Sequence, residues 1–442
     1  MKLRPQAADG HGSTAGSAGS FFRQDVAVAL IIAWVARFIF MLAMPSHARS
    51  FDAIAWETVA DTLNAGGNPY QTTSFLSWPP FWFQMLFVIS KISSFLSLPF
   101  FRVLQLSLII IESIVIVLLA KLIHQITPQA RVRALLIFGI ALNPAAILLI
   151  CQHCNFDVMV VLWVLLFLLN LLRFNQTKDP ADCLCACLFL GLGILTKTVP
   201  LVLVPLLAGG FRTVAGPIKL MGLALLFGPA ALGMSVIYVI APAGVTTHVL
   251  GYHSIGDFFG VSGLLHLAGL DPLAALYNLF FYLLLLTLML RASLWFWQAR
   301  SMGDRETVLL TALLLVLIPA LGPGYGPHYL YWFLPLLVAS YAFFEGKWRR
   351  VLIAFGVVAA ITYLVEYALV GSDGMYLLKI LASNKETLRQ AVSLLPVVQK
   401  CESPTGLTLI RLPLFIAYLA LLKVGTDILL EQIKNRQKQM DG

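Results

Sequence analysis

Long apolar segments alternate with short polar ones along nearly the whole chain, and this pattern predicts transmembrane helices. Most apolar segments are about as long as a helix needs to cross the hydrocarbon layer. Lipid offers the backbone no hydrogen-bond partners, so such segments must be helical. The runs are continuous, which excludes a barrel of short strands with alternating hydrophobicity. We therefore predict an all-α polytopic membrane protein with about twelve transmembrane helices, at 25–44, 103–123, 134–150, 157–173, 183–196, 199–211, 218–240, 273–295, 307–321, 329–345, 351–370 and 411–430.

One further apolar stretch, 81–98, decides on which side every later loop lies. It follows Pro79-Pro80 and contains Lys91 and several serines. If it lies as a re-entrant or surface helix, the short loops rich in Lys and Arg fall on one side together with both basic chain ends. Lys and Arg collect on the cytoplasmic side of membrane proteins. We therefore predict that this side is the cytoplasm, although the loop 371–410 would then be external despite its basic residues.

Composition supports a membrane protein and narrows its class. Hydrophobic residues make up 59% of the 442 residues and charged residues only 12%, too few to cover a soluble surface. The net charge of +9 is explained by cytoplasmic anchoring loops, so no nucleic-acid partner is expected. The Cys-X-X-Cys at 151–154 suits a metal or redox pair, but no second pair stands at zinc spacing. Cysteine is also an ordinary small residue of apolar helices.

The expected organisation follows from these spans and loops. The N-terminal segment is polar and rich in Gly, Ser and Ala, which is typical of a disordered tail. The organisation comprises a disordered cytoplasmic tail (1–24), a transmembrane catalytic module (25–345) with an external loop (45–98), C-terminal transmembrane helices (346–432) with an external loop (371–410), and a cytoplasmic tail (433–442).

The external loop after the first span carries the first candidate for chemistry. Asp52 follows the end of that span by only a few residues. A partly desolvated carboxylate beside the bilayer can act as a general base toward an acceptor hydroxyl. The alternative is a solvated loop carboxylate or the N-cap of a short helix over 53–65. Tyr70, further along this loop, is a candidate substrate-binding residue.

Two basic residues lie within or at the end of apolar segments, where a charge is costly without a partner. Lys197 lies at the external end of a tight helical hairpin, where a lysine is costly without a partner. A lipid phosphate would provide one, and snorkelling to the interface is the alternative. Arg37 lies within the first span. It is a candidate for the same phosphate, or for a structural ion pair with Glu112 or Glu366.

Aromatic and polar residues also concentrate in two external turns. His328, a further candidate for the phosphate, lies in a segment rich in Gly, Pro and Tyr, and such irregular backbone is tolerated where it lines a cavity. Tyr325 and Tyr329 flank it as candidates to bind a sugar, or as an interfacial aromatic belt. Asn155 and Asp157 stand at the start of the fourth expected span as candidate substrate ligands. Plain helix capping explains Asn155 equally well.

The sequence lacks the motifs of several other classes of protein. There is no phosphate-binding Gly-rich loop followed by Lys-Ser/Thr, no zinc-protease helix and no nucleophile elbow. No internal repeat is evident, which weakens an inverted-repeat transporter.

Taken together, the external motifs resemble the glycosyltransferases of the C-type (GT-C) fold that use lipid-linked sugars, and most closely the bacterial polyprenyl-phosphate-mannose-dependent mannosyltransferases. The resemblance covers the chain from the first span to about residue 340. The motifs that carry it are Asp52 after the first helix, Asn68-Pro69-Tyr70 followed by Pro79-Pro80, Asn143-Pro144 leading to Asn155-Phe156-Asp157, Leu195-Thr196-Lys197 with Pro200 and Pro205, and His328-Tyr329 with Trp332 and Pro335.

The resemblance implies roles for individual residues. Asp52 matches the aspartate that deprotonates the acceptor hydroxyl, and Lys197 and His328 match residues near the donor phosphate. Surface helices in the first external loop are also a family feature. Two departures, the lack of a second acidic residue beside Asp52 and Asn155 in place of glutamine, leave the sugar open. No metal ligand and no certain cofactor is predicted, and the resemblance leaves open whether the reaction uses a divalent cation.

The expected activity is inverting transfer of a sugar, a hexose such as mannose, from a polyprenyl-phosphate donor to a lipid or glycan acceptor. A single displacement needs one base and stabilisation of the departing phosphate rather than two flanking carboxylates. The expected location is a bacterial inner membrane, with the site on the extracytoplasmic face. The alternatives are a transporter or flippase of an anionic lipid-linked sugar, and a structural subunit of an envelope assembly complex.

Overall fold

The computed structural model describes residues 14–44, 49–72, 77–127, 129–250, 259–298, 302–341, 346–369 and 403–441, together with residues 386, 396, 400 and 401. Within these ranges the secondary structure is helical and no strand occurs, which confirms the all-α prediction. Most of the expected external loop 371–410 lies outside the described residues.

Eight helical stretches of the described residues are long and apolar enough to cross a membrane. The chain is therefore a multi-pass membrane protein, as its hydropathy predicts. Six of the stretches fall on α5 (Phe100–Ile126), α8 (Asp157–Thr177), α11 (Gly216–Ile240), α14 (Asp271–Gln298), α17 (Lys347–Leu369) and α21 (Pro404–Asp441). The other two are the apolar part of α1 (Thr14–Ala43) and the succession of α6 (Ala130–Ala141), α7 (Pro144–Leu148) and the π-helix η2 (Leu149–His153).

The prediction of about twelve spans is not confirmed. Four expected spans fall on elements that are short, interrupted or charged. Pro200 and Pro205 lie within the second of these elements, and a proline cannot donate a backbone hydrogen bond inside a helix. The elements are α9 (Pro180–Thr196), the 3-10 helix η3 (Val199–Leu207) with α10 (Ala208–Thr213), α15 (Asp304–Leu321), and the 3-10 helix η5 (Pro327–Trp332) with α16 (Leu334–Tyr341).

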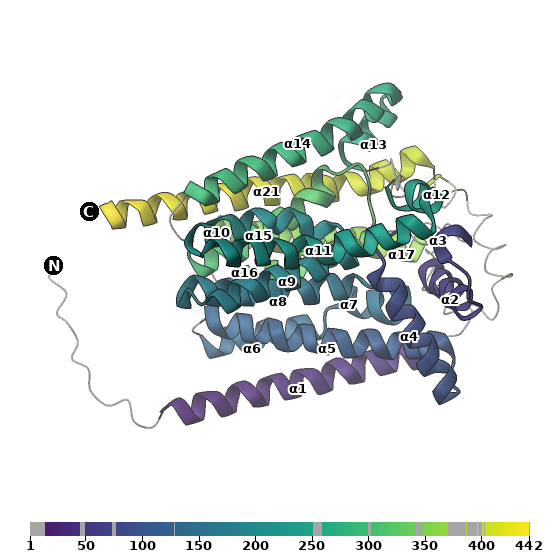
Figure 1. The fold of residues 1–442 in the computed structure, drawn as a ribbon, viewed down its shortest axis with the longest axis horizontal. Helices are drawn as coiled ribbons and strands as arrows, with labels where there is room; N and C mark the ends of the chain where they lie inside the picture. The colour runs from purple at the N-terminus through teal and green to yellow at the C-terminus, as the bar shows by residue number, and fades with distance from the viewer. Residues whose placement is uncertain are drawn as a thin grey trace.

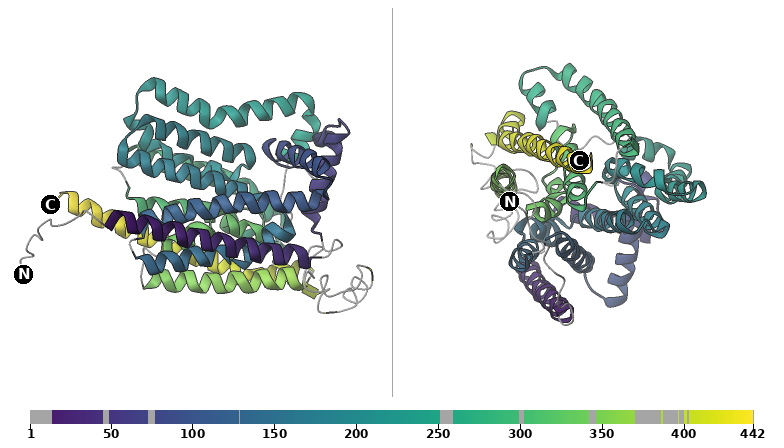
Figure 2. Two further views of the ribbon diagram at one scale, coloured as in Figure 1. Left: turned by 90° about the horizontal axis from the view of Figure 1, so that it is seen from below. Right: turned by 90° about the vertical axis from the view of Figure 1, so that its left-hand side faces the viewer.

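Short helices gather at one end of the bundle, which we call the α2 end (Figure 1). The stretch 81–98, expected to be a surface or re-entrant helix, forms the 16-residue helix α4 and packs against α2 and α5. The start of α1 and the C-terminal end of α21 lie at the opposite end (Figures 1 and 2). The short helices are α2 (Phe51–Asn64), α3 (Pro69–Thr72), α4 (Phe81–Leu96), α12 (Pro242–Gly244), the π-helix η4 (Val245–Leu250) and α13 (Gly260–Leu267).

Both terminal helices extend into segments that the sequence assigns to tails and a loop. Helix α1 begins at Thr14, inside the expected tail 1–24. Helix α21 begins at Pro404, inside the expected loop 371–410, and continues to Asp441 through the expected tail 433–442. Adding a residue to an existing helix is far easier than starting one. The apolar spans therefore propagate helix into flanking polar sequence, and residues 1–13 lie outside the described part.

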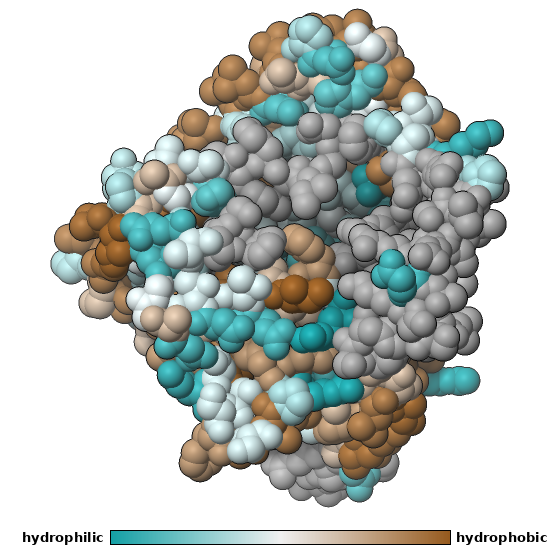
Figure 3. Space-filling model, turned by 90° about the vertical axis from the view of Figure 1, so that its right-hand side faces the viewer, coloured by the Kyte–Doolittle hydropathy of each residue, from teal (hydrophilic) through white to brown (hydrophobic). Residues whose placement is uncertain are grey.

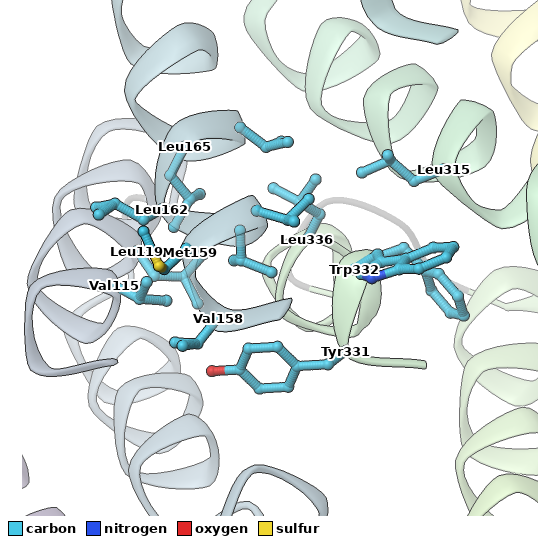
Figure 4. Packing of buried hydrophobic residues seen from close by; sticks show 14 of the residues in the cluster. Val115, Leu119, Val158, Met159, Leu162, Leu165, Leu315, Tyr331, Trp332 and Leu336 are labelled. Carbon is cyan, nitrogen blue, oxygen red and sulfur yellow. The ribbon is translucent and has the colours of Figure 1, made fainter. Parts of the chain in front are cut away.

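Helix α8 forms the centre of the fold. Its apolar window is 78% buried, whereas the corresponding windows of α11 and α14 are 11% buried and leave their side chains for lipid. Figure 4 shows Met159 and Leu162 of α8 packed beside Leu119 of α5, with Leu336 of α16 on another side. The N-terminus of this central helix points to the α2 end and carries Asp157. The candidate site is therefore positioned by the membrane-spanning helix whose apolar window is the most buried.

Candidate functional site

The turn that leads into α8 has an unusual backbone, and this backbone arranges the polar residues of the site. The π-helix η2 ends at Cys154, which adopts a left-handed conformation (φ 53°). The backbone N–H of Asn155 donates to the carbonyl of Leu149 over 3.1 Å. Asn155 Oδ1 then accepts the backbone N–H of Asp157 over 2.9 Å. The sharp reversal brings His153, Asn155 and Asp157 together at the start of α8.

Helix α2 is attached to this turn by two hydrogen bonds. Ser50 caps α2 by accepting the amide of Ala53 over 3.0 Å, and its hydroxyl donates to the carbonyl of His153 over 2.8 Å. The indole of Trp56 donates to the carbonyl of Cys154 over 3.1 Å. Because both contacts involve the first turns of α2, they fix the position of Asp52 relative to α8.

Asp52 lies between two groups of the turn. Its Oδ2 accepts a hydrogen bond from Asn155 Nδ2 over 2.9 Å and lies 3.1 Å from Nε2 of His153. Burial alone would raise the pKa of this carboxyl, but the charge of His153, hydrogen bonds from His153 and Asn155, and the charge of Lys197 outweigh it and hold the pKa below its usual value. The side chain stays 23% exposed. Asp52 is therefore an ionised carboxylate that a ligand can reach.

Lys197 is buried in an ion pair inside an aromatic cage. Its Nζ lies 2.7 Å from Oδ1 of Asp157, and the two side chains are 1% and 0% exposed. The rings of Trp78, Trp332, Phe156 and Tyr329 surround the ammonium at 4.3, 4.8, 5.2 and 5.4 Å from its Nζ. A carboxylate and the negative faces of aromatic rings both stabilise a cation away from water. The expected partner, a lipid phosphate, is thus replaced in this structure by Asp157.

His328 lies between Asp157 and His153. Its Nε2 lies 3.8 Å from Oδ2 of Asp157, and its ring packs edge-on against that of His153 at a centroid distance of 5.3 Å. Burial and the positive charges of Lys197 and His153 lower its pKa well below the usual value. Neither Nδ1 of His328 nor Oδ2 of Asp157 has a hydrogen-bond partner in the described part of the chain. The site thus contains two buried polar atoms without a hydrogen bond.

These five side chains form one continuous arrangement, the polar array, made of Asp52, His153, His328, Asp157 and Lys197. Asn155 connects Asp52 to Asp157: its Nδ2 donates to the carboxylate of Asp52, and its Oδ1 accepts the backbone N–H of Asp157. The array lies at the α2 end. Figure 3, which faces this end, shows hydrophilic side chains gathered in a band between apolar flanks. Lipid-facing apolar surface and a reachable carboxylate therefore occur at the same end of the protein.

The structure brings together six of the nine residues that the sequence singles out. Five of these, Asp52, Asn155, Asp157, Lys197 and His328, meet in or beside the polar array, and Tyr329 contributes to the lysine cage. Tyr325 lies elsewhere, stacked on Phe259 with a centroid distance of 4.4 Å and covered by Arg411. Tyr70 is 1% exposed, and its hydroxyl donates to the carbonyl of Trp78 over 2.7 Å. It thereby supports a ring of the cage from behind.

Arg37, a candidate for the donor phosphate, lies in the protein core. Its guanidinium forms a buried two-point ion pair with Glu112, one of its two expected structural partners. It also donates to the carbonyls of Ala33 and Ala141 over 3.0 and 2.7 Å. The side chain is 1% exposed. Its donors are thus engaged within the protein, and Arg37 is not part of the polar array.

The sequence did not single out His153 or the rings of the lysine cage. His153 was visible between polar neighbours in the turn that also holds Asn155 and Asp157, and this clustering was the available signal. Trp78 and Trp332 have no local signal, because a tryptophan at membrane level is equally typical of an interfacial belt. Only the fold brings the segment before α4, with Trp78, and η5, with Trp332, to Lys197 at the end of α9.

Metal ligation has little support in the described residues. No group of three or more His, Cys, Asp or Glu side chains there is arranged to hold a metal ion. Cys151 and Cys154 of the Cys-X-X-Cys are both free and buried. Cys151 donates weakly to the carbonyl of Arg37 over 3.7 Å, so it takes part in packing beneath the turn.

Replacing Tyr70 with phenylalanine tests whether its hydroxyl supports Trp78 or binds substrate. The change leaves a buried carbonyl without its partner, so we expect a loss of about 1–2 kcal/mol in the free energy of unfolding, measured by thermal or denaturant unfolding in detergent. The exposed Tyr282 provides a matched control, Tyr282→Phe, which should leave stability unchanged. Unchanged stability in Tyr70→Phe together with weaker substrate binding would support the substrate role instead.

Comparison with known proteins adds no relative to this picture: no family model matches the chain, and no curated protein matches it. A function must therefore be argued from the geometry and chemistry of the polar array.

Proposed function

We propose that the protein is a membrane glycosyltransferase that moves a hexose such as mannose from a polyprenyl-phosphate donor to a lipid or glycan acceptor. The observation that carries this proposal is the polar array. It combines a reachable ionised carboxylate, Asp52, with imidazoles and a caged lysine at the end of a membrane bundle. A donor with an apolar tail and a phosphate-linked sugar needs this combination of lipid access, base and positive charge.

The proposed topology places the polar array on the extracytoplasmic face of a bacterial inner membrane. In it, α9, η3 with α10, α15, and η5 with α16 also cross, which completes about twelve passes. Short basic loops then collect at the opposite end, as cytoplasmic loops do. The basic residues lie in or beside the connections before α6, α9, α11, α15 and α17, largely on the adjoining helix ends.

Asp52 is the proposed general base. The acceptor hydroxyl attacks the anomeric carbon, its proton passes to the Asp52 carboxylate, and the bond between that carbon and the phosphate oxygen breaks. His153 and Asn155 keep Asp52 ionised and oriented. The same two residues also reduce the basicity of Asp52, because a carboxylate with a lowered pKa is a weaker proton acceptor. The base is accordingly available over a wide pH range.

The departing phosphate gains negative charge, and His328 is the proposed group that meets it. The His328 side chain is 17% exposed, and an anion that reaches its ring favours protonation of the imidazole, which can then donate to the phosphate and toward Asp157. Lys197 offsets the charge of Asp157 and so preserves a positive potential around His328. Its aromatic cage excludes water, which strengthens these interactions.

The remaining candidates have supporting parts in this proposal. Asn155 and Asp157 fix the base and His328 rather than filling a separate sugar subsite. Tyr329 stacks on Trp332 with a centroid distance of 4.1 Å, at the edge of the cage. It offers the hexose an aromatic face near His328, with ring centroids 4.7 Å apart.

Sugar transfer by the purified protein tests the proposed activity. The full chain is reconstituted into liposomes with a set of radiolabelled polyprenyl-phosphate sugars and a membrane extract as the source of acceptors. We expect label to move from the prenyl donor to a lipid or glycan, with the mannosyl donor among the active ones. If no donor in the set transfers its sugar, the proposal fails.

One structural feature favours a second candidate, a flippase of an anionic lipid-linked sugar. Several membrane-level helices are interrupted: α7 continues as a π-helix, η3 is a 3-10 helix, and η5 precedes α16. Discontinuous helices are typical of transporters. A flippase moves labelled donor across the bilayer without transferring its sugar and does not require a base. The same liposomes therefore distinguish the two functions.

Asn155→Asp is expected to shift the pH dependence of transfer. The change removes a hydrogen bond that lowers the pKa of Asp52 and adds a like charge beside it, so that pKa rises. A higher pKa leaves less ionised base at low pH. The acidic limb of the pH profile of kcat/KM therefore moves to higher pH. Asn143→Asp, which changes the capping asparagine of α7, should leave the limb in place, and an unmoved limb in Asn155→Asp would remove Asp52 as the titrating base.

A further inference from the structure

A second polar cluster lies between α17 and α21, outside the polar array. Arg411 Nε donates to Glu366 Oε1 over 2.7 Å, and the guanidinium carbon lies 4.5 Å from the centroid of the Tyr325 ring. Glu366 is 6% exposed and Arg411 14%. The two helices pack side by side (Figure 2). Glu366 lies near the end of α17 and Arg411 near the start of α21, so the pair sits close to one end of the bundle.

Most donors of Arg411 are unused. Only Nε makes a hydrogen bond, and both terminal nitrogens lack a partner in the described part of the chain. The hydroxyl of the nearby, fully buried Tyr418 also lacks one. A guanidinium presents its terminal N–H groups as a fork that fits two oxygens of a phosphate or carboxylate. The Arg411 side chain is 14% exposed, so an anion can reach this fork.

An apolar groove of about 150 Å³ lies beside the ion pair, between the same two helices. One of its lining residues, Thr362, stands one helical turn from Glu366 on the same face of α17, and another, Ile410, precedes Arg411. Ile361, another lining residue, is 58% exposed. The groove therefore runs from the ion pair toward the membrane interior, lined by Val358, Ile361, Thr362, Val365, Ile410 and Pro413.

We propose that this place binds a membrane lipid with a phosphate head group. The phosphate lies on the terminal nitrogens of Arg411, and the first part of an acyl or prenyl chain lies in the groove. Charge complementarity decides the occupant: an apolar helix would leave the guanidinium unsatisfied, and free phosphate would leave the groove empty. The inference rests on Arg411 and the groove and does not depend on the proposed transfer reaction.

Native mass spectrometry of the full chain, titrated with phosphatidylglycerol in detergent, tests this site. We expect Arg411→Gln to weaken lipid binding by at least about tenfold, because it removes charge-assisted hydrogen bonds. Ile361→Trp fills the groove but keeps the ion pair, and we expect a similar loss. Lys423→Gln provides the matched control, since Lys423 is a cation on the same helix, 76% exposed and paired with Asp427. It should bind lipid like the wild type.

Two further measurements keep the test decisive. Arg411→Gln leaves Glu366 buried and unpaired, so the double variant Arg411→Gln/Glu366→Gln removes both charges and should fold while still binding lipid weakly. Inorganic phosphate at millimolar concentration should not displace the lipid, because it cannot occupy the groove. Wild-type lipid binding in the double variant or in Ile361→Trp would overturn the proposal, as would displacement by inorganic phosphate.

Discussion

Asp52→Asn is expected to lower sugar transfer by about 10²- to 10⁴-fold, the usual contribution of a positioned general base. The amide keeps the size and most of the hydrogen bonding of the side chain but cannot take the acceptor proton. Because Asp52 is 23% exposed at the edge of the polar array, the fold should tolerate the change. The measurement is initial rate of transfer, with donor binding determined separately.

The control for this variant is Asp61→Asn, an exposed aspartate on the same helix. It changes the net charge of α2 equally and should transfer sugar at the wild-type rate. Donor affinity in Asp52→Asn should stay within a few-fold of the wild type, since the base acts on the acceptor. Full activity in Asp52→Asn would show that this carboxylate is not the base, whatever else the array does.

Arg37→Met is expected to cost about 3–5 kcal/mol in the free energy of unfolding, because it leaves Glu112 buried without its partner. Both side chains of this pair are 1% exposed. The double variant Arg37→Met/Glu112→Leu removes both charges and should recover most of the loss. Stability is measured by unfolding in detergent, with the exposed Arg131 as the matched control, Arg131→Met.

This variant also separates the two roles that the sequence allows for Arg37. A structural arginine predicts low stability with near-normal donor affinity in the molecules that remain folded. A donor-phosphate ligand predicts normal stability with weakened donor binding. The second pattern would contradict the assignment of Arg37 to the core.

The sequence predicts the class of this protein well because class depends on composition and on the period of the hydrophobic pattern. It also places Asp52 directly after the first span and Asp157 at the start of the fourth. Both positions follow from where apolar runs end. Helix continuity is less visible, since prolines in an apolar run leave its hydropathy high while they break its hydrogen bonds. The span expected at 199–211 is for this reason a 3-10 helix followed by a short α-helix.

Partner choice is the part that local sequence cannot supply. Lys197 clearly requires an anion, yet nothing near it in sequence indicates Asp157, forty positions away along the chain. For Arg37 both Glu112 and Glu366 fit the composition, and only the packing of α1 on α5 selects Glu112. Glu366 instead pairs with Arg411. Each of these pairs joins helices whose neighbourhood is decided by the whole fold.

The most direct test of the central claim is the anomeric configuration of the product, determined by NMR after transfer from a donor of known configuration. A single displacement with Asp52 as base predicts a product of opposite configuration to the donor, formed by the wild type and lost in Asp52→Asn. A product of the same configuration would contradict the proposed displacement. The absence of any transferred sugar, with labelled donor moved across the bilayer, would contradict the enzyme and establish the flippase instead.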